Sequence, residues 1–139
     1  METKKMYDDI GIAGIDIIHN GTMYQVMGLI CVAAAAYLIG NISPAILIGR
    51  AHGIDIKKEG SGNAGTTNVL RTMGKKAAVI TLLIDVFKGV FAVVFAGLLV
   101  GNLAAMTAAV AVFCGHVWPI FFGFKGGKGV ATAFGALCG

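Results

Sequence analysis

The feature that most limits the fold of this chain is a long stretch without charge. Residues 89–124 contain no Asp, Glu, Lys or Arg. As a single helix this stretch would be about 54 Å long, whereas the hydrocarbon layer of a bilayer is roughly 30 Å thick. The stretch therefore has to fold back on itself, and we expect the turn at Gly101 and Asn102. The sequence predicts a helical hairpin within a membrane.

The composition favours a membrane location for the whole chain. Of its 139 residues, 57% are hydrophobic and 13% are charged, and the mean hydropathy is +0.82. A soluble domain carries about 25% charged residues, so this chain has too few charged residues to cover a water-facing surface. Its length allows one domain. The net charge of +4 comes from basic residues beside apolar stretches, which favours an anionic membrane surface or anionic substrates. We therefore expect membrane lipids as partners and no nucleic acid.

Apolar stretches predict an all-α, polytopic integral membrane bundle with three full spans and the start of a fourth. We expect the spans at residues 26–48, 77–99 and 103–122, with a kink in the first one before Pro44. Residues 129–139 would make about 16 Å of helix, which is half of a crossing. The chain is therefore expected to be C-terminally incomplete.

The first residues of the chain differ from the rest. Residues 1–23 are polar and are expected to form an N-terminal extension to a membrane domain at 24–139. A cleaved signal peptide is a weaker interpretation, because the first apolar stretch follows a long segment of net negative charge rather than a short basic one.

The distribution of basic residues predicts the orientation of the spans. The loop at 50–76 carries six basic residues against two acidic ones, and the next loop carries Lys125 and Lys128. Alternating spans place both loops on one side, which the positive-inside rule assigns to the cytoplasm. The N-terminus is then expected outside.

A polar, glycine-rich segment at 60–71 reads GSGNAGTTNVLR. Three glycines in six residues let backbone N–H groups turn towards an anion, and Arg71 offers a two-pronged contact to phosphate. Neutral donors and acceptors come from Ser61, Asn63, Thr66, Thr67 and Asn68. A flexible, solvated loop explains the same composition equally well.

A second glycine-rich segment, GFKGGKGVAT at 123–132, comes directly before a predicted helix. Glycines, lysines and a helix N-terminus together favour a bound phosphate. The segment is not a Walker A loop, because its glycine spacing is one residue short and Gly129 follows Lys128 where that loop has Ser or Thr. The alternative is that both lysines only mark the membrane boundary.

Ionisable residues also lie inside the predicted spans. Asp85 and Lys88, three residues apart, share a helix face and can pair. Such residues are costly in a membrane and commonly face a functional cavity, although an ion pair that only positions helices is an equal alternative. His116 near the end of the third span could titrate usefully, but a lone histidine there more often has a structural role.

At these motifs the sequence closely resembles the acyl-phosphate-dependent glycerol-3-phosphate acyltransferases of bacteria, the PlsY family. The matching segments are GSGNAGTTNVLR, DVFKG and GHVWPIFFGFKGGKGVAT, and the resemblance covers roughly residues 26–139. It implies an all-helical membrane enzyme with its active site at the cytoplasmic face. The family has a third cytoplasmic motif with a histidine and an asparagine near its C-terminus, and this chain ends before such a motif.

The resemblance also implies roles for individual residues. Ser61 and Arg71 would carry the activity of the first motif, and residues 125–129 are similar to the family's glycerol-phosphate-binding loop. The catalytic candidates are Ser61, Asn63, Asn68 and Arg71. The substrate-binding candidates are Thr66, Lys88, His116, Lys125, Gly126, Gly127, Lys128 and Gly129.

The expected reaction transfers an acyl group from acyl phosphate to glycerol 3-phosphate, which gives 1-acylglycerol 3-phosphate and phosphate, at the bacterial inner membrane. No metal or cofactor is expected from the resemblance, and the three cysteines fit neither a disulfide framework nor a zinc site. A soluble enzyme that supplies acyl phosphate is an expected partner.

Two other functions remain possible interpretations of the same features. A small transporter or channel for phosphate-bearing solutes would also carry glycines and a buried ion pair, although the inverted repeat typical of transporters is not evident. A non-catalytic assembly subunit would use the Gly-x-x-x-Gly spacings at 97–101 and 135–139, which arise easily by chance in such a sequence.

Overall fold

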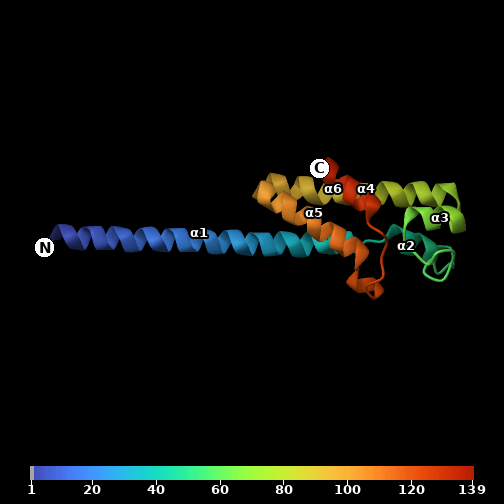
Figure 1. Ribbon diagram of the computed structural model, residues 1–139, viewed down its shortest axis with the longest axis horizontal. Helices are drawn as coiled ribbons and strands as arrows, with labels where there is room; N and C mark the ends of the chain where they lie inside the picture. The colour runs from blue at the N-terminus through green and yellow to red at the C-terminus, as the bar shows by residue number, and fades with distance from the viewer. Residues whose placement is uncertain (1) are drawn as a thin grey trace.

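The computed structural model describes the backbone of residues 2–139 and the side chains from residue 21 onward (Figure 1). The helices follow one another along the chain as α1 (Glu2–Gly40), α2 (Pro44–Ala51), α3 (Thr66–Met73), α4 (Lys75–Val100), α5 (Asn102–Val117), the 3-10 helix η1 (Ile120–Phe122) and α6 (Val130–Cys138). The described residues contain no strand, which confirms the all-α prediction. Three helical segments are long and apolar enough to cross a membrane, namely Gly21–Ala51, Lys75–Val100 and Asn102–Phe122.

The first helix is longer than a membrane span requires. It begins at Glu2, so the polar N-terminal segment continues the same helix into the first span. Figure 1 shows this N-terminal part extending away from the other helices. Helices α4 and α5 pack against the C-terminal part of α1, and α2 and α3 lie beyond its end.

The predicted kink in the first span is a complete break in the helix. Helix α1 ends at Gly40 and α2 begins at Pro44, whose ring fixes a helical φ and whose missing N–H costs nothing at a first turn. The side chain of Asn41 donates to the carbonyl of Tyr37 at 2.7 Å and thereby caps the end of α1.

The predicted hairpin is present, with its turn at the predicted place. Gly101 alone separates α4 from α5, and its φ of 110° lies in a region that L side chains rarely adopt. Alanines and one valine form the core between α1, α4 and α5: Ala36, Ala92, Ala96, Ala104, Ala108 and Val112. Small residues let helix backbones approach closely, which drives packing where lipid removes the hydrophobic advantage.

Two pairs of glycines mark the closest helix crossings. An added Cβ at Gly115 on α5 would collide with the carbonyl of Tyr37 and come within 3.1 Å of the Cα of Gly40 on α1. An added Cβ at Gly135 on α6 would collide with the carbonyl of Val86, and one at Gly89 on α4 would lie 2.7 Å from the Ala136 nitrogen. These crossings hold α1 against α5 and α4 against α6.

The two basic loops meet at the same end of the bundle (Figure 1). The ammonium of Lys57 donates to the carbonyl of Phe122, and the guanidinium of Arg50 lies 5.3 Å from the centre of the Phe122 ring. Partial burial lowers the pKa of Lys57, against the opposing effect of the nearby carboxylate of Asp55. The loop after α2 and the loop before α6 therefore form one connected surface.

We expect Gly89→Ala to destabilise the bundle, because its methyl group would collide with the backbone of α6. Overpacking of this kind costs roughly 1–3 kcal/mol. Gly97→Ala is the matched control on the same helix, since its Cβ would make an ordinary 3.4 Å contact with Ala105. Thermal unfolding in detergent should show a lower midpoint for Gly89→Ala and an unchanged or higher one for Gly97→Ala. Equal midpoints for the two variants would contradict the crossing.

Candidate functional site

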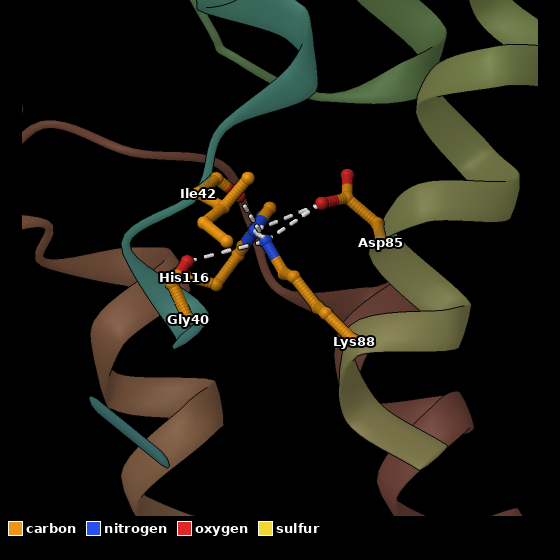
Figure 2. Close-up of polar contacts among 5 residues, drawn as sticks. All are labelled: Gly40, Ile42, Asp85, Lys88 and His116. Atoms are coloured by element: carbon orange, nitrogen blue, oxygen red, sulfur yellow. Dashed lines mark hydrogen bonds and ion pairs between the residues drawn. The ribbon is translucent and has the colours of Figure 1, made fainter. Parts of the chain in front are cut away.

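A buried ammonium group joins three helices near the break in the first span (Figure 2). Lys88 Nζ on α4 donates to the carbonyl oxygens of Ile42 at 2.7 Å and Gly40 at 3.2 Å, and it lies 2.7 Å from His116 Nδ1 on α5. The carboxylate of Asp85, one turn away on α4, lies 2.8 Å from the same nitrogen. The predicted pairing of Asp85 with Lys88 is therefore confirmed.

This network compensates charges that would otherwise be costly in a membrane. The Asp85, Lys88 and His116 residues are 2%, 6% and 4% exposed. A charge buried without a partner costs several kcal/mol, whereas a paired and hydrogen-bonded one is tolerated. The carbonyls of Gly40 and Ile42 are free to accept because the helix breaks there, so the break and the ion pair depend on each other.

The first glycine-rich segment is held by one asparagine. The amide nitrogen of Asn68 donates to the carbonyls of Ile56 at 3.2 Å and Glu59 at 3.0 Å, and its oxygen accepts from the N–H of Ser61 at 2.9 Å. Both hydrogens of the amide are thus used within the loop, and Asn68 is 1% exposed. Asn68 fixes the backbone at Ser61, while the side chains of Ser61 and Arg71 are exposed.

The second glycine-rich segment is attached to the end of α5. The N–H of Gly126 donates to Val117 at 3.0 Å and the N–H of Gly127 donates to His116 at 3.3 Å, so neither is free for a ligand. An added Cβ at Gly126 would collide with the carbonyl of His116, and one at Gly127 with the His116 ring nitrogen Nε2. Positive φ occurs at Gly123 and Gly129 and not at these two glycines. Close packing against His116 therefore explains why both positions are glycine.

A cavity of about 430 Å³ lies beside the buried network, between the start of α3, the middle of α4 and the start of α6. One part of its wall is polar and is formed by Asn63, Thr66, Thr67, Asp85, His116 and Lys128. The other part is apolar and is formed by Leu82, Val86, Val130, Ala131 and Phe134. The cavity can thus take a ligand with a charged head and an aliphatic chain.

Two helix N-termini converge on this cavity. Gly65 and Thr66 begin α3, Gly129 and Val130 begin α6, and all four residues line the wall. The first N–H groups of a helix lack partners within it, and neither helix has a side-chain cap. Free N–H groups and the positive ends of two helix dipoles, with Lys128 beside them, form a site for an anion such as phosphate.

The structure brings some of the predicted site residues together. Asn63, Thr66, His116, Lys128 and Gly129 line the cavity. The remaining candidates lie outside its wall: Ser61, Asn68, Arg71, Lys88, Lys125, Gly126 and Gly127. Of these, Lys88 contacts the wall residues Asp85 and His116 directly. Arg71 follows Thr67 by one turn of α3 and shares its face.

Several lining residues were absent from the predicted set. The sequence indicates Asp85 only as the partner of Lys88, although the motif DVFKG is a sufficient signal for a place in the site. The apolar residues of the wall gave no signal, because they resemble every other lipid-facing residue of the chain. No group of three His, Cys, Asp or Glu among the described residues could hold a metal ion.

Comparison with known proteins identifies the family. Residues 30–139 match the model of a family described as glycerol-3-phosphate acyltransferase. The chain belongs to this family. It is 51% identical over 120 residues to the glycerol-3-phosphate acyltransferase of Clostridioides difficile (strain 630), which covers 81% of this chain and 59% of that protein. The corresponding protein of Alkaliphilus metalliredigens (strain QYMF) is 51% identical over 105 residues, which is 75% of this chain and 54% of that protein.

Solved structures agree with this assignment. The crystal structure of PlsY, an integral membrane glycerol 3-phosphate acyltransferase, in its glycerol 3-phosphate form has a TM-score of 0.75 and 40% identity. That match covers 78% of this chain and 56% of PlsY. The lysophosphatidic acid form of PlsY gives a TM-score of 0.72 at the same identity. The chain thus spans between half and three fifths of the length of the relatives described here.

We expect Asn68→Ala to loosen the first glycine-rich segment, because the buried carbonyl of Ile56 loses its donor and the N–H of Ser61 loses its acceptor. Each unsatisfied buried group costs about 1–3 kcal/mol. Hydrogen exchange at the Ser61 amide should therefore accelerate roughly tenfold or more. Asn63→Ala changes the same residue type in the same loop and should leave that rate nearly unchanged. Equal acceleration in both variants would show that Asn68 does not hold the loop.

Proposed function

We propose that this protein transfers an acyl group from acyl phosphate to glycerol 3-phosphate, forming 1-acylglycerol 3-phosphate and inorganic phosphate. The observation that carries the proposal is the convergence of two uncapped helix N-termini and Lys128 on one cavity with an apolar side. Family membership and the existence of PlsY structures in glycerol 3-phosphate and lysophosphatidic acid forms support the same assignment.

The geometry of the cavity suits the proposed substrates. A phosphate group fits the polar wall, where Asn63 and Thr66 add neutral donors to the helix N-termini. An acyl chain fits the apolar wall between α4 and α6, where Val86 and Phe134 face the cavity. A ligand that carries both a phosphate group and an acyl chain would be oriented by the polar and the apolar wall, with its reactive carbonyl where the two walls meet.

In the proposed reaction the hydroxyl oxygen of glycerol 3-phosphate attacks the carbonyl carbon of acyl phosphate. An ester bond forms, the bond between the acyl carbon and the phosphate oxygen breaks, and the released inorganic phosphate ends with the hydroxyl proton. Both substrates are anions, so cations and N–H groups are needed to hold them close together. Because acyl phosphate already has a good leaving group, positioning and electrostatic stabilisation supply much of the catalysis. In this proposal Ser61 orients the substrates, and Arg71, Lys125 and Lys128 hold phosphate oxygens.

We also propose on which side of the membrane the active site lies. The two basic loops that meet at one end of the bundle would face the cytoplasm of a bacterium, as the positive-inside rule requires. The active site would then lie at the cytoplasmic face of the inner membrane, and the N-terminus would lie outside. Acyl phosphate would reach it from a soluble enzyme.

We expect the purified protein in detergent to release phosphate when it receives glycerol 3-phosphate together with acyl phosphate. Acyl-CoA of the same chain length should give no product, because its acyl group is bonded to the sulfur of a bulky thiol and not directly to the phosphate that the proposed site holds. Phosphate release and the lysophosphatidate product are both measured. Turnover with acyl-CoA in place of acyl phosphate would move the protein to a different class of acyltransferase.

We expect Lys128→Gln to raise the KM for glycerol 3-phosphate. Lys128 lines the cavity but is also exposed, so the lost contact is worth about 1–2 kcal/mol, a five- to thirtyfold change. Lys58→Gln makes the same change of charge at a side chain that is 82% exposed and should leave KM nearly unchanged. Steady-state kinetics with each substrate varied separates the effects. An equal rise in both variants would indicate only a general loss of positive charge.

A further inference from the structure

We propose that Lys88 fixes the tautomer of His116, so that this imidazole offers its Nε2–H to an oxygen of a phosphate group bound in the cavity. The inference deepens the proposed function and rests on it for the identity of the ligand. Lys88 is then a positioning residue, and His116 is the residue that touches the substrate.

The contacts of Lys88 determine which ring nitrogen carries the hydrogen. An ammonium group has three hydrogens and no acceptor. Three acceptors surround Lys88 Nζ in hydrogen-bonding geometry, namely the carbonyls of Gly40 and Ile42 and His116 Nδ1. Since Nδ1 has to accept, the imidazole carries its hydrogen on Nε2.

Asp85 is the group that could reverse this assignment. Its Oδ1 atom lies 3.3 Å from His116 Nδ1 and could accept a hydrogen from it. However, the same oxygen lies closer to Lys88 Nζ, at 2.8 Å, and among the described residues no donor is aligned with it as a hydrogen bond. The carboxylate thus serves as the counter-ion of the ammonium, and the ammonium takes the Nδ1 lone pair.

We infer that the opposite edge of the His116 ring, which carries Nε2, is the edge turned towards the cavity. His116 lines the cavity together with Lys128 and the start of α6. An added Cβ at Gly127 would collide with Nε2 and would lie 3.1 Å from the neighbouring ring carbon Cε1. The absence of a side chain at Gly127 therefore leaves room for the Nε2 edge, beside the two helix N-termini that favour an anion.

The tautomer can be measured without any assumption about activity. The protein, labelled with ¹⁵N-histidine in detergent micelles, is examined by long-range ¹H–¹⁵N correlation spectra. The three histidines are distinguished by the signal lost in His116→Gln. We expect a protonated Nε2 and an unprotonated Nδ1 in the wild type. A protonated Nδ1 there would overturn the inference.

Lys88→Met tests whether the ammonium is responsible for the tautomer. This variant keeps most of the side-chain length, and we expect the hydrogen to move to Nδ1, where Asp85 can accept it. Because an unpaired buried carboxylate can also destabilise the fold, the double variant Asp85→Leu with Lys88→Met removes both charges. It should fold with near wild-type stability and show a mixture of tautomers. A wild-type tautomer in both variants would overturn the role of Lys88.

Two probes test the contact with phosphate. Glycerol 3-phosphate and an unreactive acyl phosphonate are titrated separately, so that the signal shows which phosphate group receives the hydrogen bond. At least one should shift the Nε2 resonance of His116 in the wild type and bind ten- to a hundredfold more weakly to His116→Gln. Binding of either probe without a shift and without weakening would overturn the contact. Lack of binding and of turnover by the wild type would instead overturn the proposed function, and with it the ligand assigned here.

Discussion

The ammonium group of Lys88 is the interaction on which the arrangement of the spans depends. A lysine in the middle of a membrane helix is unfavourable by several kcal/mol unless its charge and its three hydrogens all find partners. The partners come from three places: a carboxylate one turn away on α4, two carbonyls freed by the break between α1 and α2, and a ring nitrogen on α5. Satisfying one side chain therefore fixes the relative positions of all three spans.

Close helix packing makes this arrangement possible. The crossings at Gly115 and Gly135 leave no space for a side chain between α5 and α1 or between α6 and α4. Small alanines between α4 and α5 bring these two helices near enough for His116 to reach Lys88. The same close packing of α6 against α4 leaves the cavity between the beginning of α6 and the beginning of α3. Glycine thus acts at these crossings through the space it leaves free, and at turns such as Gly101 through its backbone freedom.

The candidate site contains two kinds of charged group, one that faces the cavity directly and one that acts through His116. The helix N-termini and Lys128 present positive potential directly to the cavity. Of the buried ion pair, Asp85 belongs to the wall and Lys88 lies behind it, where low polarity strengthens the effect of the ammonium on His116. An anion with an apolar tail fits such a site better than a small inorganic ion does, and the membership of the chain in the glycerol-3-phosphate acyltransferase family agrees with that chemistry.

The sequence by itself determined the class of fold, the three spans, an irregularity of the first span before Pro44, the turn at Gly101 and the pairing of Asp85 with Lys88. All of these follow from local physical causes: the length of apolar stretches against the thickness of a bilayer, the backbone chemistry of proline and glycine, and the helical spacing of two charges. Its motifs also identified the family. Only the tertiary structure decided which candidates share a cavity and which support it from outside. Asn68 proved to hold a loop and Gly127 to leave room for His116, because these roles depend on contacts between residues distant in sequence, which no local pattern records.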